Sequence, residues 1–143
     1  MAESRITQGL NAQQREAVTA GDGPVLVLAG PGSGKTRVLT HRIAYLIEEM
    51  DIRPWHIMAV TFTNKAARVM EARVLTLLEG SDRIDGLSIG TFHAICARIL
   101  RREAEWTPFT RDYLIYDTAD QLAAVKMAIN ELNLDEKKYT PRG

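Results

Sequence analysis

Ala29-Gly30-Pro31-Gly32-Ser33-Gly34-Lys35-Thr36 is the stretch that decides the fold. It fits the phosphate-loop pattern, with alanine at the position where the strictest form has glycine. Glycines permit the tight loop whose backbone N–H groups surround phosphates. Lys35 would reach the β- and γ-phosphates, and the Thr36 hydroxyl would ligate Mg²⁺. The pattern therefore predicts binding of ATP or GTP together with Mg²⁺.

The sequence on either side of this loop fits the same interpretation. Before it, Val25-Leu26-Val27-Leu28 is a continuous apolar run, typical of a strand buried on both faces. After it, apolar residues recur at helical spacing and predict an amphipathic helix over residues 36–49. Lys35 and Arg37 would lie at the positive end of that helix, which costs about 0.3–1 kcal/mol each. A bound polyphosphate removes this conflict, whereas the alternative, a glycine-rich turn without a ligand, does not.

The strand-helix unit repeats along the chain. Residues 57–60 and 87–90 are apolar runs that predict two further strands, and a helical apolar pattern follows each. Asn11 is suited to cap a helix over residues 12–20, ahead of the first strand. Alternating strands and helices indicate a parallel α/β sheet flanked by helices. The apolar faces of the two later helices carry Ala67, Met70, Val74, Leu77 and Leu78, and then Phe92, Ile95, Cys96, Ile99 and Leu100.

The character of the chain changes near Glu103. Trp106-Thr107-Pro108-Phe109 reads as a connection, and Thr118-Ala119-Asp120-Gln121 as a capping box that opens another helix. We therefore predict a first part over residues 1–102 and a mostly helical attachment over residues 103–143. The apolar face of the helix in this attachment carries Leu122, Val125, Ile129 and Leu132.

Composition indicates an ordinary globular protein, with 45% hydrophobic and 25% charged residues. Basic and acidic side chains number 18 each, so bulk charge does not indicate nucleic-acid binding. The single cysteine, Cys96, excludes an internal disulfide framework and a Cys-rich zinc site, and its apolar stripe predicts a core position. No apolar run approaches the ~20 residues that span a bilayer, and the N-terminus lacks a signal peptide's apolar stretch. We expect a cytoplasmic protein without a membrane partner.

Polar segments follow two of the predicted strands at the edge where open α/β sheets bind ligands. These segments are Thr61-Phe62-Thr63-Asn64-Lys65 and Gly90-Thr91-Phe92-His93. Aromatic rings stack on bases and small polar groups bind phosphates, so the mixture suits single-stranded nucleic acid. From the residues alone, structural roles are the alternative: Phe62 in the core, Thr63 or Asn64 as an N-cap, and His93 as a hydrogen-bonded histidine.

Stretches from nearly the whole chain match a known family in collinear order. They include Leu10-Asn11-Ala12-Gln13-Gln14-Arg15-Glu16-Ala17-Val18, residues 29–37, residues 60–67 and residues 90–93. Residues 36–46, 117–122 and 133–137 show the same likeness. On these motifs the sequence resembles the UvrD, PcrA and Rep group of superfamily 1 DNA helicases. The resemblance implies a P-loop NTPase (RecA-like) fold, incomplete in this chain, with residues 103–143 starting a helical inserted subdomain.

The resemblance also implies roles for single positions. Gln14 matches a glutamine that reads the adenine edge, which favours ATP over GTP. Arg37 matches a basic residue beside the nucleotide. The DNA-binding positions it implies are Phe62 as an aromatic of the single-strand track, Thr63 and Asn64 near the DNA backbone, and Thr91 and His93 in a further DNA-contacting motif.

A helicase of this group also needs an acidic pair on a later strand, which holds Mg²⁺ and positions the attacking water. An apolar run over residues 113–116 ends in Asp117, but Thr118 follows it as a helix cap, so we do not expect Asp117 to bind the metal. The chain ends abruptly at residues 141–143. We therefore expect an N-terminal piece that binds nucleotide weakly and does not hydrolyse ATP at the rate of a motor.

The function implied by the resemblance is that of a motor enzyme. The complete helicase would hydrolyse ATP, move 3′-to-5′ along single-stranded DNA and separate duplexes in replication or repair. Its partners would be single-stranded and duplex DNA and the remainder of the helicase chain. Two alternatives stay open: the motor segment of a helicase-nuclease, and a non-catalytic nucleotide-binding module.

Overall fold

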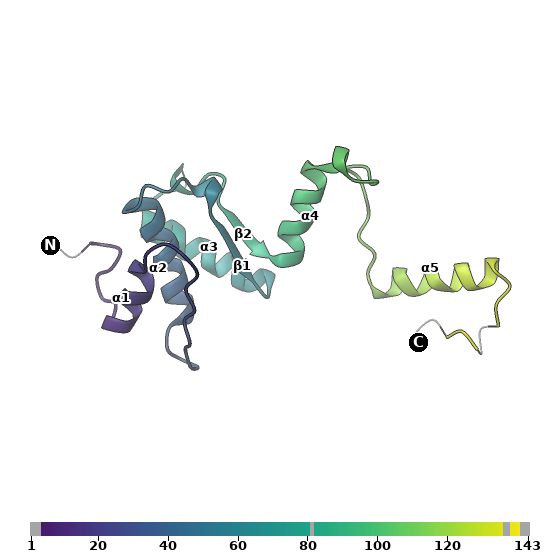
Figure 1. Ribbon diagram of the computed structural model, residues 1–143, viewed down its shortest axis with the longest axis horizontal. Helices are drawn as coiled ribbons and strands as arrows, with labels where there is room; N and C mark the ends of the chain where they lie inside the picture. Colours follow the sequence, from purple (N-terminus) through teal and green to yellow (C-terminus); the bar gives the residue numbers. More distant parts are fainter. Residues whose placement is uncertain (1–3, 81, 136–137, 141–143) are drawn as a thin grey trace. The chain divides into compact units, whose positions relative to one another are not determined.

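The computed structural model describes residues 4–80, 82–135 and 138–140. The chain divides into two compact units, Met1–Ile99 and Leu100–Gly143. The first unit contains, in chain order, α1 (Ala12–Thr19), α2 (Lys35–Glu48), β1 (Met58–Thr61), α3 (Asn64–Leu78), β2 (Ser88–Thr91) and most of α4 (Phe92–Arg102) (Figure 1). The second contains the end of α4 and α5 (Thr118–Glu131). Short 3₁₀ turns cover Pro54–His56, Asp82–Ile84 and Ala104–Trp106.

The two strands pair in parallel, with Met58 opposite Ser88 and Thr61 opposite Thr91. The α/β class and the parallel pairing predicted from strand-helix alternation are thus confirmed. Because parallel strands end at the same edge, the segments after β1 and after β2 emerge side by side (Figure 1).

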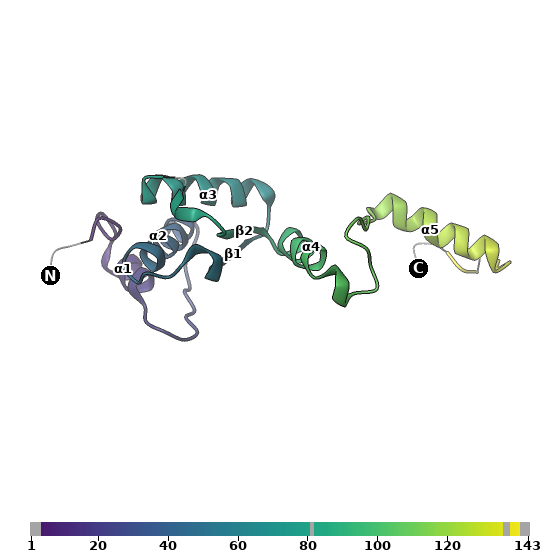
Figure 2. The same ribbon diagram turned by 90° about the horizontal axis from the view of Figure 1, so that it is seen from above.

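The core of the first unit lies where α3 packs on α2 and on the strand pair, while α1 packs on α2 (Figure 2). Val74 and Leu78 of α3 are fully buried, and Met70 is 3% exposed. The face of α3 predicted from apolar spacing is therefore its buried face. Each such side chain contributes about 1.5–3 kcal/mol when it leaves water. From α2 and the N-terminal segment, the buried core cluster adds Ile43, Ala44 and Ile6.

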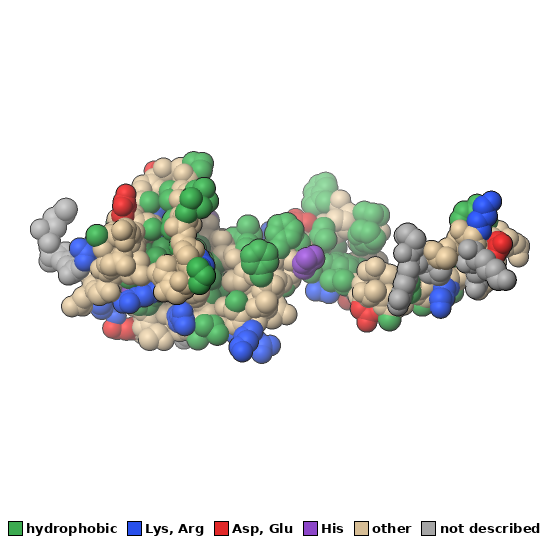
Figure 3. All heavy atoms as spheres, turned by 90° about the horizontal axis from the view of Figure 1, so that it is seen from below, with side chains coloured by type: hydrophobic (Ala, Val, Ile, Leu, Met, Phe, Trp, Pro, Cys, Tyr) green, Lys and Arg blue, Asp and Glu red, His purple; other side chains and the backbone are tan. Residues whose placement is uncertain are grey.

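The predicted strand over residues 25–28 does not form within the part of the chain that the structure describes. Leu26 and Leu28 are 83% and 88% exposed, which contradicts burial on both faces. A strand needs neighbours that pair its backbone groups and cover its side chains, and no described segment supplies them. Met58 and Val60 on the open face of β1 are exposed for the same reason. Hydrophobic side chains accordingly reach the surface of the molecule (Figure 3).

The apolar face of α4 is also less buried than predicted. Ile95 is buried and lies close to Gly90 of β2, where an added Cβ would meet Ile95 Cγ1 at 3.2 Å. Cys96 is only half-buried, so its predicted core position is wrong. Ile99 is 42% exposed, and the buried residues of α4 are Ile95 and Ala97.

The capping box of α5 begins one residue earlier than predicted. Asp117, not Thr118, is the N-cap: its Oδ1 accepts hydrogen bonds from the N–H groups of Ala119 (2.8 Å) and Asp120 (2.9 Å). Asp120 in turn accepts from the Asp117 N–H at 3.1 Å. A carboxylate suits this position because it also faces the positive end of the helix dipole.

The apolar face of α5 is covered only in part. Ile129 is buried, whereas Val125 and Leu132 are 43% and 67% exposed. Among the described residues, no helix is both long and apolar enough to cross a membrane.

Candidate nucleotide site and strand-edge surface

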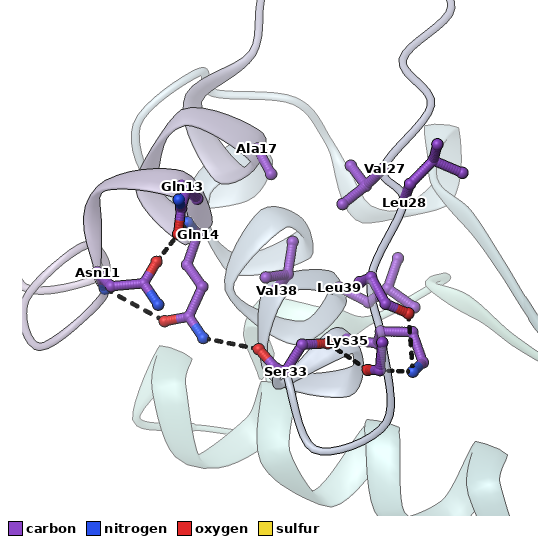
Figure 4. A pocket seen from close by; sticks show the side chains of 12 residues that line it. Asn11, Gln13, Gln14, Ala17, Val27, Leu28, Ser33, Lys35, Val38 and Leu39 are labelled. Atoms are coloured by element: carbon purple, nitrogen blue, oxygen red, sulfur yellow. Dashed lines mark hydrogen bonds between the residues drawn. The ribbon is translucent and has the colours of Figure 1, made fainter.

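The glycine-rich loop closes on itself ahead of α2. The Lys35 ammonium donates to the backbone carbonyls of Ala29 (3.2 Å) and Gly30 (2.8 Å), and the Ser33 hydroxyl donates to the Gly30 carbonyl at 2.7 Å (Figure 4). Gly34 has φ +86° and is the N-cap of α2, a left-handed conformation that glycine adopts without steric cost. The helix predicted after the loop is confirmed, and it begins at Lys35.

A cavity of about 570 Å³ opens between α1, residues 27–30 and the first turns of α2. Its size falls in the range usual for small-molecule sites, which combine an apolar lining with a few polar groups. The apolar lining comes from Ala17, Val27, Leu28, Val38 and Leu39 (Figure 4). The predicted nucleotide-binding residues in the lining are Gln14, Ala29, Gly30, Ser33 and Lys35. The others, which lie in the loop or in the first turn of α2 without lining the cavity, are Pro31, Gly32, Gly34, Thr36 and Arg37.

Gln14 joins α1 to the loop. Its Oε1 accepts from the Asn11 backbone N–H at 3.2 Å, and its Nε2 donates to the Ser33 carbonyl at 3.0 Å (Figure 4). The Gln14 backbone N–H donates to Asn11 Oδ1 at 2.8 Å, which completes a capping box at the start of α1. The predicted N-cap role of Asn11 is thereby confirmed.

The first turn of α2 is strongly electropositive. It contains Lys35 and Arg37 and no acidic residue, so two cationic side chains lie at the positive end of the helix. Arg37 is exposed, and its Nη2 donates to the Gly9 carbonyl at 3.1 Å. A helix N-terminus of this kind attracts phosphate groups. The geometry therefore fits a polyphosphate ligand.

Thr36, in the same turn, offers an exposed hydroxyl oxygen of the kind that Mg²⁺ accepts. Across the described residues, no three His, Cys, Asp or Glu side chains gather into a metal-binding group. The Thr36 hydroxyl would be one of the ligands of a Mg²⁺ ion bound beside phosphates at this loop.

The last residue of each strand and the residues that follow it, 61–64 and 91–93, form what we call the strand-edge surface. Phe62 has a fully exposed side chain, so the core position considered for it is wrong. Thr63 is the N-cap of α3, because its Oγ1 accepts from the Ala66 N–H at 3.1 Å, and Asn64 is the first helical residue. Of the two N-cap candidates, Thr63 is thus confirmed.

The second half of this surface follows β2. Thr91 Oγ1 accepts from the Ala94 N–H at 3.2 Å at the start of α4. Phe92 is 65% exposed, and its ring meets the ring of His93 edge-on with centroids 6.3 Å apart. His93 is exposed rather than buried. The register of the strands, Thr61 opposite Thr91, brings all the residues predicted to bind DNA to one edge.

Two contacts that fix the site on its scaffold had no signal in the sequence pattern. His41 is buried, with Nδ1 at 2.5 Å from the Ile6 carbonyl oxygen. Arg42 Nη1 donates to the Val18 carbonyl at 2.7 Å, in the last turn of α1, where carbonyls lack helical partners. Both side chains come from α2 and hold segments that precede the loop. The sequence pattern does not reveal these two contacts, because each joins segments that are far apart in the chain.

The structure has a parallel pair of strands flanked by helices, and a glycine-rich loop leads into one of these helices, α2. This arrangement defines an α/β protein. Within this class, the family model of the UvrD/REP helicase N-terminal domain matches residues 10–142. The chain belongs to this family, and the resemblance on its motifs is confirmed.

Several ATP-dependent DNA helicases named PcrA are similar to this chain. The Bacillus subtilis protein is 52% identical over 139 residues, which are 97% of this chain and 18% of the relative. The Leuconostoc citreum protein is 48% identical over 142 residues, 99% of this chain and 19% of the relative. The Staphylococcus aureus (strain Mu50) protein is 48% identical over 133 residues, which are 93% of this chain and 18% of the relative. The chain thus spans about a fifth of the length of these relatives.

Proposed function

We propose that this chain is the ATP-binding segment of an ATP-dependent DNA helicase with a RecA-like P-loop fold. The observation that supports the proposal most strongly is the closed loop at the N-terminus of α2. Gln14 of α1 hydrogen-bonds to this loop, and α1, the loop and α2 together line one cavity. The relatives that match nearly the whole chain are named as ATP-dependent DNA helicases, which supports the same activity.

In this proposal Lys35 and the loop N–H groups hold the phosphates, and the Thr36 hydroxyl binds Mg²⁺. The absence of acidic side chains from the first turn of α2 supports an anionic ligand there. Gln14 and the apolar lining of the cavity receive the base, and Arg37 lies beside the nucleotide. When bound, ATP supplies the free energy of phosphoanhydride cleavage.

We further propose that the strand-edge surface contacts single-stranded DNA. Phe62 presents a fully exposed ring and Phe92 a ring that is 65% exposed, and bases can stack on both. Thr63, Asn64, Thr91 and His93 lie beside these rings in sequence and supply hydroxyl, amide and imidazole groups for the DNA backbone. In the complete protein, ATP turnover would move this surface along the strand in the 3′-to-5′ direction, within replication or repair in the cytoplasm.

The domain assignment is part of the same proposal. Residues 1–102 form part of a first RecA-like domain, and residues 103–143 begin a helical subdomain inserted in it. The exposed apolar side chains of residues 25–28 and of β1 support this, because further strands of a RecA-like sheet would cover them. Asp117 acts as a helix cap, so we propose that ATP turnover at a motor's rate depends on carboxylates outside this chain.

Calorimetric titration of the 143-residue chain with ATP and Mg²⁺ tests the nucleotide site. We expect saturable binding by the parent chain and a loss of at least tenfold in the Lys35→Ala variant. Equal binding by both would refute the site. Steady, DNA-stimulated ATP turnover by the purified chain would instead refute the dependence on further carboxylates.

A further inference from the structure

The side-chain amide of Gln14 lies between two partners of opposite kind. The Asn11 backbone N–H can only donate, and it faces Gln14 Oε1 at 3.2 Å. The Ser33 backbone carbonyl can only accept, and it faces Gln14 Nε2 at 3.0 Å. Rotating the amide by half a turn would set donor against donor and acceptor against acceptor. The two backbone groups therefore fix which end of the amide is oxygen and which is nitrogen (Figure 4).

The space around Nε2 is also restricted. An added Cβ on Gly34 would lie 2.9 Å from Gln14 Nε2, so the amide is in close contact with the loop backbone. On the other side, Gln14 and Asn11 hold each other through the capping box of α1. The amide thus has a fixed position as well as a fixed orientation. One lone pair of its oxygen and one N–H of its nitrogen are left for a ligand.

Such an amide distinguishes purine bases. Adenine offers the N6 amino donor and the N7 acceptor on one edge, which match an acceptor and a donor held in fixed order. Guanine offers two acceptors, O6 and N7, on the corresponding edge, so a fixed amide oxygen there opposes another acceptor. A freely rotating glutamine could turn its NH₂ group toward both guanine acceptors and tolerate the base.

We propose that Asn11 and the Ser33 carbonyl are the elements that fix the Gln14 amide and thereby set the preference for adenine over guanine. This inference rests on the proposed nucleotide site. Asn11 is a positioning residue that acts through Gln14: its Oδ1 holds the Gln14 backbone N–H at 2.8 Å, and this bond keeps its own N–H directed at Gln14 Oε1. Ser33 takes part through its backbone.

The test compares ATP and GTP affinities of the 143-residue chain and its Asn11→Ala variant by equilibrium titration. We expect the ATP-to-GTP affinity ratio to fall about 3- to 10-fold, the effect of losing one restraining hydrogen bond. Asn11→Asp keeps the capping oxygen and should restore the ratio. The matched control is Asp117→Ala, which removes the same kind of capping box from α5 and should leave the ratio unchanged.

A second readout does not need nucleotide. In ¹⁵N NMR spectra of the free chain, the Gln14 side-chain NH₂ pair, identified by its loss in Gln14→Ala, should be shifted from random-coil positions. The shift should collapse in Asn11→Ala and persist in Asp117→Ala. If Asn11→Ala fails to fold, Asn11→Gly replaces it, because glycine at an N-cap costs little stability.

The outcomes separate the two proposals. A lower ratio and a collapsed shift in Asn11→Ala support the inference. An unchanged ratio in a variant that still binds ATP overturns the inference and leaves the nucleotide site standing. If the parent chain binds neither nucleotide, the nucleotide site and the base preference built on it are both overturned.

Discussion

The ammonium nitrogen of Lys35 lies 2.8 Å from the carbonyl oxygen of Gly30, five residues earlier in the chain. With its bond to Ala29 at 3.2 Å, this contact folds the loop back over the first turn of α2. The lysine is exposed, so the contact organises the loop without belonging to the core.

Lys35→Ala should therefore separate ligand binding from folding. Loss of a charge-assisted contact with phosphate costs about 1.5–3 kcal/mol, or roughly 10- to 150-fold in affinity. The melting temperature should stay close to that of the parent chain, because surface substitutions usually change stability by less than about 0.5 kcal/mol. Calorimetry measures the first effect and circular dichroism the second. Loss of the folded state would show that the lysine is structural.

Gly34→Ala should destabilise the chain. Gly34 has φ +86°, where an L-residue costs about 1–2 kcal/mol, and an added Cβ would lie 2.9 Å from Gln14 Nε2. The matched control is Gly80→Ala, where the added Cβ meets nothing within 4 Å and φ is not positive. Denaturant unfolding of the two variants compares their stabilities. Equal stability would mean that the loop relaxes freely around residue 34.

Periodicity predicted the elements that bury their apolar faces within this chain. The stripe of α3 was predictable because Met70, Val74 and Leu78 recur at helical spacing and find α2 and the strands to cover them. The glycine loop was predictable because its residue types suit one local geometry, including the positive φ of Gly34. Gln14 was found through the family motif. Its contact with Ser33 joins residues 19 positions apart and leaves no periodic trace.

The predictions were wrong where burial was inferred from hydrophobicity alone. Residues 25–28 have the composition of a buried strand, but composition cannot tell whether neighbouring strands are present. The core position predicted for Cys96 was wrong for a related reason: its stripe is apolar, but Ile95 and Ala97 are the residues of α4 that are buried. The Asp117 cap was displaced by one residue because threonine and aspartate both suit N-caps, and the sequence places them side by side.

Leu78→Ala should reveal how much stability the core of the first unit provides. Leu78 is fully buried in the cluster where α3 meets α2, so its truncation should cost about 2–5 kcal/mol. Val69→Ala on the same helix is the control, because Val69 is 39% exposed and should change stability by about 0.5 kcal/mol or less. Urea titration followed by circular dichroism gives both values. A small loss for Leu78→Ala would indicate that this cluster does not form in solution.

The side chain of Phe62 supplies the sharpest test of the DNA surface, because it is fully exposed and its removal should leave the fold intact. Stacking of one base on an aromatic ring is worth about 1–3 kcal/mol, so Phe62→Ala should weaken binding of an oligo(dT) strand by roughly 5- to 150-fold. Fluorescence anisotropy of a labelled strand measures this loss. The slope of affinity against salt should change little, since no phosphate-neutralising charge is removed.

Trp55→Ala is the matched control for this effect. Trp55 is an exposed aromatic (56%) in the same unit, but it precedes β1 and thus lies at the opposite end of the strand from Phe62. Removing the Trp55 ring also lowers the exposed aromatic surface of this unit, but it leaves the strand-edge surface intact. If stacking at the strand edge holds the DNA, only Phe62→Ala loses affinity. Equal losses in both variants would mean that the DNA binds through nonspecific aromatic contact, and no loss in either would remove Phe62 from the proposed track.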